Sequence, residues 1–202
     1  MPSRFRLRRV FQGLVSWIAH PLAQAGVRPN TITYFSLFLA LLAALSLNIT
    51  NSQIMFGILV FLSGLFDGVD GAVAREQKRS SDLGAFTDSV IDKVSEIIIL
   101  GSIAIEYSGY IFLNLEVELW VFIAISGWLL TSYSRSRASH LGVKDIDIGL
   151  GGRSERLFTL VAFSVLSQLL WGLVVTAVMG VLTAGYRFYK YQNELSHQRE
   201  ST

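Results

Sequence analysis

The chain has 202 residues, of which 51% are hydrophobic and only 16% are charged, with a mean hydropathy of +0.48 and a formal net charge of +2. Soluble domains usually carry about 25% charged residues, so this balance excludes an ordinary soluble domain and predicts a polytopic membrane protein. There are no cysteines, which excludes a disulfide framework, a thiolate metal site and a cysteine nucleophile.

The N-terminal segment combines arginines with apolar side chains at helical spacing. Phe11, Trp17 and Ile18 fall roughly on one face of a helix over residues 3–25, and four arginines crowd its start. We expect an amphipathic interfacial helix, within residues 1–27, that lies on an anionic membrane surface. No cleavable signal peptide is predicted, because a polar stretch follows where small residues would be needed.

Apolar segments of membrane length then alternate with short polar turns. They predict six transmembrane helices over about residues 31–49, 54–74, 83–107, 119–140, 155–170 and 173–190. Pro29 and Asn30 stand where the first of these helices begins, with Asn30 as a plausible N-cap. The fold class is therefore an all-α integral membrane protein. We expect one membrane domain over residues 1–202, with a six-helix bundle at 28–192 and a polar tail at 193–202.

The positive charges predict the orientation of this bundle. The 17 Lys and Arg residues lie at the N-terminus, around 75–93, between 135 and 156, or at 187–199. None lies in the predicted loops around Thr50, Glu116 or Trp171. The positive-inside rule then places both termini, and the second and fourth loops, in the cytoplasm of a multi-pass protein of the cell membrane.

Four carboxylates interrupt the apolar pattern at the cytoplasmic ends of the second and third predicted helices. Asp67 and Asp70 are three residues apart, and Asp88 and Asp92 are four apart, so each pair shares a helix face. A short loop joins the two helices, which should therefore be antiparallel neighbours with converging carboxylates. The alternative is that the four carboxylates are simply solvated at the helix ends. Their position on the small-residue faces of two neighbouring helices instead favours a binding site.

Unpaired carboxylates at this depth are costly, so the cluster needs a counter-charge. Arg75 and Lys93 are too few and too peripheral to neutralise it. One or two divalent cations would do so, and hard oxygen ligands favour Mg²⁺ or Mn²⁺ over Zn²⁺. Gly71, Gly84 and Ala74 leave room on the same faces for a ligand, although small residues also serve tight packing between membrane helices.

The motif D-x-x-D-G-x-x-A-R followed by G-x-x-x-D-x-x-x-D resembles the signature of the CDP-alcohol phosphotransferases. Its fixed positions are Asp67, Asp70, Gly71, Ala74, Arg75, Gly84, Asp88 and Asp92. The resemblance extends over nearly the whole chain, and the segment from Pro29 to Thr33 is similar to the start of the family's first membrane helix. A homodimer is implied by the family alone.

The resemblance implies a reaction and a role for each residue of the motif. Two ions, Mg²⁺ or Mn²⁺, would bind the pyrophosphate of a CDP-lipid. Asp92 would also be the general base, taking a proton from the acceptor alcohol as its oxygen attacks the lipid-side phosphorus and CMP leaves. The implied metal ligands are Asp67, Asp70, Asp88 and Asp92. The implied CDP-lipid-binding residues are Asn30, Thr33, Asp67, Asp70, Gly71, Ala74, Arg75 and Gly84.

The acceptor alcohol is indicated by the second half of the chain. Several arginines close to a metal site favour an acceptor with its own phosphate, although they could also be a positive-inside anchor set. The run S-Y-S-R-S-R-A at 132–138, the E-R-L at 155–157 and a late arginine resemble the phosphatidylinositol phosphate and archaetidylinositol phosphate synthase branch. Inositol 1-phosphate would then be held by Ser132, Arg135, Arg156 and Arg187. Ser139-His140 and Gly151-Gly152 depart from that branch.

Several alternatives stay open at this stage. Glycerol 3-phosphate would also suit the arginines, whereas serine would leave them unused. A divalent-cation transporter should carry polar residues through the outer half of its helices, which is nearly all apolar here, and polyprenyl aromatic transferases lack the motif. The expected partners are a CDP-lipid, a phosphorylated polyol and membrane lipids, with no nucleic acid. The lipid could be diacylglycerol- or archaeol-based; the absence of cysteine weakly suits a heat-adapted organism and so archaeol.

Overall fold

The computed structural model describes residues 11–200 apart from 144–145, 147 and 150, and side chains as far as Ser196. Within these residues the chain is almost entirely helical, which confirms the all-α part of the predicted fold class. The helices are α2 (Gln12–Gln24), α3 (Pro29–Thr50), α4 (Gln53–Glu76), α5 (Asp82–Glu106), α6 (Val117–His140), α7 (Arg153–Val165) and α8 (Leu169–Glu200). The loop predicted between α5 and α6 contains a small antiparallel hairpin, β1 (Ile111–Phe112) and β2 (Leu115–Glu116).

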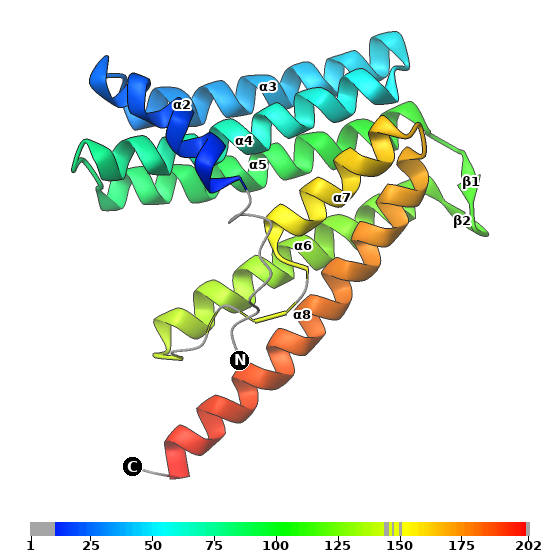
Figure 1. Cartoon of the computed structure of the whole chain (residues 1–202). Coiled ribbons are helices and arrows are strands. Elements are labelled where there is room, and N and C mark those ends of the chain that lie inside the picture. Colours follow the sequence, from blue (N-terminus) through cyan, green and yellow to red (C-terminus); the bar gives the residue numbers. More distant parts are fainter. Residues whose placement is uncertain (1–10, 144–145, 147, 150, 201–202) are drawn as a thin grey trace.

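The helices form two groups that meet along α4, α5, α6 and α7. In Figure 1, α3, α4 and α5 run side by side, while α6, α7 and α8 form the second group; α7 packs against α4 and α6 against α5. One apolar core joins the two groups, and each helix from α3 to α8 contributes to it. Its members include Leu47, Phe56, Leu100, Trp128, Leu160 and Leu173.

Small residues bring α6 and α8 into backbone contact. A Cβ placed on Gly127 would lie 2.8 Å from the backbone nitrogen of Val181, and one on Gly180 would lie 2.8 Å from the Trp128 ring. The Thr131 hydroxyl crosses the same contact and donates to the Gly180 carbonyl at 3.1 Å. Close approach of this kind is typical of helix pairs in membranes.

Four helices within the described residues are long and apolar enough to cross a membrane: α3, α4, α6 and the segment Leu169–Ser196 of α8. α5 has 25 residues, but its polar face keeps it outside that set. α7 has 13 residues, so it extends only about 20 Å. The six-span arrangement therefore stays a prediction.

The fifth predicted span, 155–170, was too long at its C-terminal end. α7 ends at Val165, and Ser167 adopts a left-handed conformation with φ of 55°. Gln53 at the start of α4 secures this turn: its side-chain oxygen accepts from the Leu169 backbone nitrogen at 2.9 Å, and its carbonyl accepts from the Ser164 hydroxyl at 2.6 Å. The α7–α8 turn therefore lies level with the α3–α4 turn.

The described part of the N-terminal helix, α2, has two apolar sides. Ile18 and Ala19 pack against Val69 and Val73 of α4, whereas Trp17 remains 75% exposed. Residues 1–10, which include most of the predicted arginine-rich start, lie outside the described residues. The exposed aromatic side chain is compatible with the interfacial helix predicted from the sequence.

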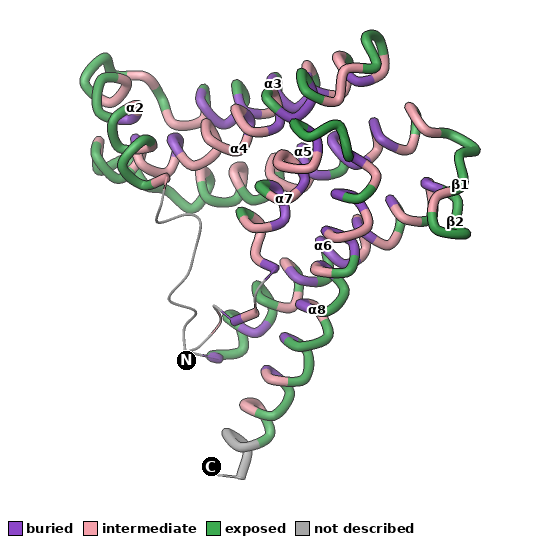
Figure 2. The backbone as a smooth tube through the Cα atoms, turned by 45° about the vertical axis from the view of Figure 1, so that its right-hand side comes forward, coloured by how far each residue is buried: buried purple, intermediate pink, exposed green. Residues whose placement is uncertain are grey.

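The segment predicted as a polar tail from residue 193 is helical as far as Glu200, because α8 continues into it. In Figure 2 the C-terminal half of α8 projects beyond the other helices, and among its described residues Gln192, Asn193 and Ser196 are exposed. Tyr191 attaches it to the α6–α7 loop, packing with Val143 and Ile148 and donating to the Ile146 carbonyl at 2.7 Å. Ile146, which packs against this cluster, also lines the large cavity between the helix groups.

Candidate active site

A cavity of about 1350 Å³ opens between the two helix groups. Its polar wall carries most of the side chains that the sequence singled out, from five helices. These are Asp67, Asp70, Gly71, Arg75, Asp88, Asp92, Ser132, Arg135, Arg156 and Arg187. Its apolar wall includes Phe11 and Val15 of the N-terminal segment, Phe61 of α4 and Phe158 of α7. One space therefore joins charged groups to a surface suited to hydrocarbon.

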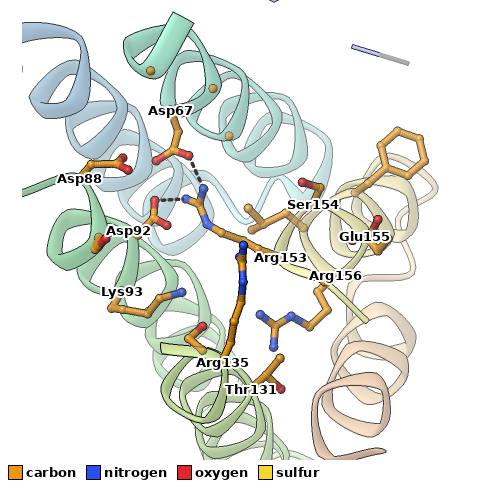
Figure 3. A pocket seen from close by; sticks show the side chains of 18 of the residues that line it. Asp67, Asp88, Asp92, Lys93, Thr131, Arg135, Arg153, Ser154, Glu155 and Arg156 are labelled. Carbon is orange, nitrogen blue, oxygen red and sulfur yellow. Dashed lines mark hydrogen bonds and ion pairs between the residues drawn. The ribbon is translucent and has the colours of Figure 1, made fainter. Parts of the chain in front are cut away.

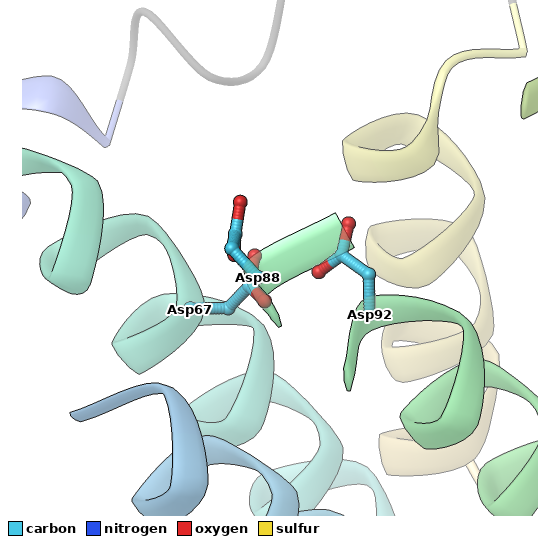
Figure 4. Close-up of side chains that lie close together, drawn as sticks. All are labelled: Asp67, Asp88 and Asp92. Atoms are coloured by element: carbon cyan, nitrogen blue, oxygen red, sulfur yellow. The ribbon is translucent and has the colours of Figure 1, made fainter. Parts of the chain in front are cut away.

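Three of the four predicted metal ligands come together in this cavity. One carboxylate oxygen from each of Asp67, Asp88 and Asp92 lies within 4.8 Å of the others. Asp67 comes from α4, and Asp88 and Asp92 lie one turn apart on α5, so two antiparallel helices build the group (Figure 4). Three hard oxygen donors at this spacing fit Mg²⁺ or Mn²⁺.

Asp70 lines the same cavity but is oriented differently. It is 4% exposed, and its Oδ2 accepts a 2.5 Å hydrogen bond from the Thr33 hydroxyl of α3. Thr33 itself does not line the cavity. The pairing satisfies a buried carboxylate and ties α3 to α4 one turn beyond Asp67, so Thr33 reaches the site through Asp70.

Arg153, the first residue of α7, crosses the cavity to the carboxylates. Its Nη1 pairs with Asp67, its Nη2 lies 2.8 Å from Asp92 Oδ1, and its Nε donates to Glu96 at 3.2 Å. Figure 3 shows the guanidinium pointing at both aspartates. Sequence reasoning missed this residue as a partner of the cluster, because only the nearby Arg75 and Lys93 were weighed as counter-charges.

Lys93 pairs with a neighbouring carboxylate that is not one of the four aspartates. Its Nζ donates to Glu96 at 2.8 Å, so it compensates the carboxylate one turn deeper rather than the aspartate cluster itself. The signal for both interactions lay in the sequence: Glu96 continues the face of Asp88 and Asp92 at helical spacing, and the cluster had more negative charge than its neighbours could balance.

The predicted acceptor residues share the opposite wall. Arg156 is 1% exposed, its guanidinium lies over the Trp128 ring at 4.7 Å, and its Nε and Nη1 have no hydrogen-bond partner among the described residues. Arg187 donates to the carbonyls of Thr131 at 2.7 Å and Ile148 at 2.9 Å. Ser132 and Arg135 line the cavity beside them.

The predicted CDP-lipid residues divide into two groups. Asp67, Asp70, Gly71 and Arg75 line the cavity, whereas Asn30, Thr33, Ala74 and Gly84 do not. Gly84 and Asn30 nevertheless face each other, because a Cβ on Gly84 would lie 3.7 Å from Asn30 Oδ1. The start of α3 and the start of α5 are thus adjacent.

Membrane-length helices around a cavity with carboxylates on one wall and arginines on the other define a multi-pass membrane protein with a site for phosphate-bearing substrates. The chain belongs to the CDP-alcohol phosphatidyltransferase family, whose model matches residues 27–185. It is therefore a transferase of phospholipid metabolism that uses CDP-alcohols.

The chain is similar in sequence to synthases of inositol-containing phospholipids. The chain is 31% identical over 178 residues to archaetidylinositol phosphate synthase of Pyrococcus horikoshii, covering 88% of this chain and 90% of that one. It is 28% identical over 160 residues to phosphatidylinositol phosphate synthase of Mycobacteroides abscessus, covering 79% and 72%.

Solved structures of phosphatidylinositol phosphate synthase from Mycobacterium tuberculosis share the fold at 24% identity. One, with CDP-DAG bound, has a TM-score of 0.74 and covers 88% of this chain and 92% of that chain. Another, in complex with manganese and citrate, has a TM-score of 0.75 and covers 88% of each.

Proposed function

We propose that this protein transfers a phosphatidyl-type group from a CDP-lipid to inositol 1-phosphate and releases CMP. The observation that carries the proposal is Arg156, a buried cation in the same cavity as the carboxylates of Asp67, Asp88 and Asp92. Two of its nitrogens have no hydrogen-bond partner among the residues that the structure describes. The names of the archaeal and actinobacterial relatives support the same acceptor.

Asp67, Asp88 and Asp92 are proposed to hold divalent cations, with Asp70 completing the set through the oxygen not used by Thr33. The oxygen donors suit Mg²⁺ or Mn²⁺, and the manganese-bound relative is consistent with either. We expect two ions, which stabilise negative charge on the attacking and leaving oxygens of a phosphoryl transfer.

Asp92 is the proposed general base. Its carboxylate takes the proton from the acceptor hydroxyl, and the resulting oxygen forms a bond to the lipid-side phosphorus while the bond to CMP breaks. Its position suits this role, because it stands between Asp88 on its own helix and Arg153 on α7. Asp92 is thus a proton acceptor on the side of the aspartate cluster that faces the proposed acceptor-binding arginines.

The acceptor phosphate is proposed to bind Ser132, Arg135, Arg156 and Arg187. Arginine presents planar paired donors that match phosphate oxygens, and the buried donors of Arg156 gain partners when a phosphate arrives. Arg187 already donates hydrogen bonds to the carbonyls of Thr131 and Ile148, so it stabilises this wall of the cavity as well as adding positive charge. Arg153 adds a further cation between this wall and the aspartates.

The CDP-lipid is proposed to bind along α4, at Asp67, Asp70, Gly71 and Arg75, with Asn30, Thr33, Ala74 and Gly84 supporting the nucleotide side. Its hydrocarbon chains would follow the apolar wall at Phe11, Phe61 and Phe158. Relatives named for archaetidyl and for phosphatidyl products leave both CDP-archaeol and CDP-diacylglycerol as donors.

The proposed membrane arrangement has six spans, α3 to α8, preceded by an interfacial helix that includes α2. Both termini and the cavity mouth face the cytoplasm, in the cell membrane, and residues 1–202 form one domain. Supporting this orientation, the α3–α4 turn, the hairpin and the α7–α8 turn gather at one end of the molecule in Figure 1, and none of these three connections carries Lys or Arg. We further propose a homodimer, as the family resemblance implies.

The test is CMP release by the purified protein in detergent, with Mg²⁺, CDP-archaeol or CDP-diacylglycerol, and one acceptor at a time. Release with inositol 1-phosphate, and not with inositol, glycerol 3-phosphate or serine, supports the proposal. Release with glycerol 3-phosphate alone would replace the acceptor. No release with any acceptor would overturn the enzymatic function.

A further inference from the structure

Glu96 lies outside the family motif, yet it is the most buried acidic group beside the cavity. It is 2% exposed, and its Oε1 accepts from both Lys93 and Arg153. Its Oε2 is buried with no hydrogen-bond partner among the described residues. A carboxylate in this position has unused capacity to accept hydrogen bonds from a cation that is already in contact with it.

Arg153 links Glu96 to the aspartates with a single positive charge. It contacts Asp67, Asp92 and Glu96 at once, so this network holds three carboxylates and only two cationic groups, Arg153 and Lys93. A divalent cation held by Asp67 and Asp92 would occupy the space that the two Nη atoms face. The guanidinium and the metal therefore compete for the same oxygens, and like charges in contact repel.

Retreat of Arg153 would be costly without another partner. A guanidinium that loses its carboxylates inside a protein leaves an uncompensated buried charge, which is strongly destabilising. Glu96 removes that difficulty, because its Oε1 already accepts from Arg153 Nε and its Oε2 has no hydrogen-bond partner in the described part of the chain. A small rotation of the guanidinium can exchange aspartate contacts for glutamate contacts.

We propose that Glu96 is a positioning residue that keeps Arg153 as an exchangeable counter-cation of the aspartate cluster. Arg153 balances Asp67 and Asp92 until a divalent cation binds, and Glu96 then retains it at the edge of the cavity, beside the acceptor wall. Glu96 thereby sets the cation affinity of the site without touching the cation. This inference rests on the proposed function of the aspartates and deepens it.

The test measures Mn²⁺ binding rather than turnover, by calorimetry or by the spin resonance of free Mn²⁺, on the full-length protein in detergent. Four proteins form a cycle: wild type, Glu96→Gln, Arg153→Gln and the double variant. Arg153→Gln should bind Mn²⁺ at least about tenfold more tightly, because the competing cation is gone. Glu96→Gln should bind it about fivefold more weakly, because Arg153 is left with the aspartates alone.

The double variant decides the mechanism. If Glu96 acts through Arg153, Glu96→Gln should change Mn²⁺ affinity at least about threefold less in the Arg153→Gln background than in wild type. Any effect of the released Lys93 is common to both backgrounds and cancels. An equal loss of Mn²⁺ affinity with and without Arg153 would overturn the proposal, because Glu96 would then act through its negative charge alone.

Glu96→Asp provides the second variant should Glu96→Gln fail to fold. It keeps the negative charge but shortens the side chain, so it should hold Arg153 less well than glutamate does. Its Mn²⁺ affinity should therefore be lower than that of wild type, by less than the loss of about fivefold expected for Glu96→Gln. An unchanged Mn²⁺ affinity would contradict a positioning role. A wild-type protein that binds no Mn²⁺ and releases no CMP overturns the proposed function itself. A wild type that does both, with additive variants, overturns this inference only.

Discussion

The guanidinium carbon of Arg156 lies over the ring of Trp128, 4.7 Å from its centre. Trp128 in turn donates from its indole nitrogen to the Thr176 carbonyl of α8 at 3.2 Å. The stack holds Arg156 through its π-face, a cation–π contact that leaves its N–H groups available. A cation held in this way is already oriented before any anion arrives.

Arg156→Gln should therefore raise the KM for the phosphorylated acceptor by at least about tenfold, since hydrogen bonds to charged groups contribute about 1.5–3 kcal/mol. The KM for the CDP-lipid should change little. Steady-state CMP release at varied acceptor concentration measures both. Arg79→Gln, at an exposed position on the α4–α5 loop, is the matched control; an equal effect in the control would assign the change to overall charge.

Asp92→Asn should separate proton transfer from cation binding. Removing a general base costs about 10²–10⁴-fold in turnover, whereas Asp67 and Asp88 still supply carboxylates to the cluster. Turnover and Mn²⁺ binding should be measured on the same preparation, with Asp82→Asn, exposed in the first turn of α5, as the control. Retained turnover would remove Asp92 as the base.

Thr33→Val tests whether the α3 contribution to the site passes through Asp70. The substitution keeps the shape but removes the 2.5 Å hydrogen bond to a buried carboxylate, so the protein should lose about 1–3 kcal/mol of stability. The melting temperature in detergent should fall, and the affinity for Mn²⁺ should change with it. Thr31→Val, exposed on the same helix, should leave both quantities at wild-type values.

Gly127→Ala should destabilise the α6–α8 pair. Its Cβ would lie 2.8 Å from the Val181 nitrogen, a backbone atom that cannot rotate away, and overpacking of this kind costs about 1–3 kcal/mol. Gly185→Ala is the control on α8, because a Cβ there meets nothing within 4 Å. The control should be neutral or stabilising, since alanine is about 1 kcal/mol better than glycine inside a helix. Equal melting temperatures would contradict the packing argument.

Local patterns predicted most of the helices and the carboxylate cluster. Pro29 at a helix start, Asp67 with Asp70, and Asp88 with Asp92 are features of spacing within one helix, and sequence shows such spacing directly. The partner of the cluster could not be found in this way. Arg153 reaches Asp67 from 86 residues away, because α7 packs against α4, and that contact depends on the tertiary arrangement.

The end of α7 was misjudged for a similar reason. Residues 166–170 are apolar enough to continue a helix, but Gln53 on another helix provides hydrogen-bond partners that favour a turn there. The polarity of residues after 192 predicted a tail but not its conformation: Tyr191 packs on the α6–α7 loop, and α8 continues as a helix. At the end of α7, a contact between distant segments overrode the local signal.

In the proposed membrane arrangement, the shortness of α7 sets the depth of the aspartate cluster. α7 ends, and α4 begins, at two turns that Gln53 connects. The 13 residues of α7 therefore span about the same height as the 15 residues from Gln53 to Asp67, roughly 20 Å. Nine further residues of α4, about 14 Å, stand above that level. In that arrangement, we expect the water-soluble acceptor to pass about two turns of α4 before it reaches the aspartates, whereas the CDP-lipid can reach them without leaving its leaflet.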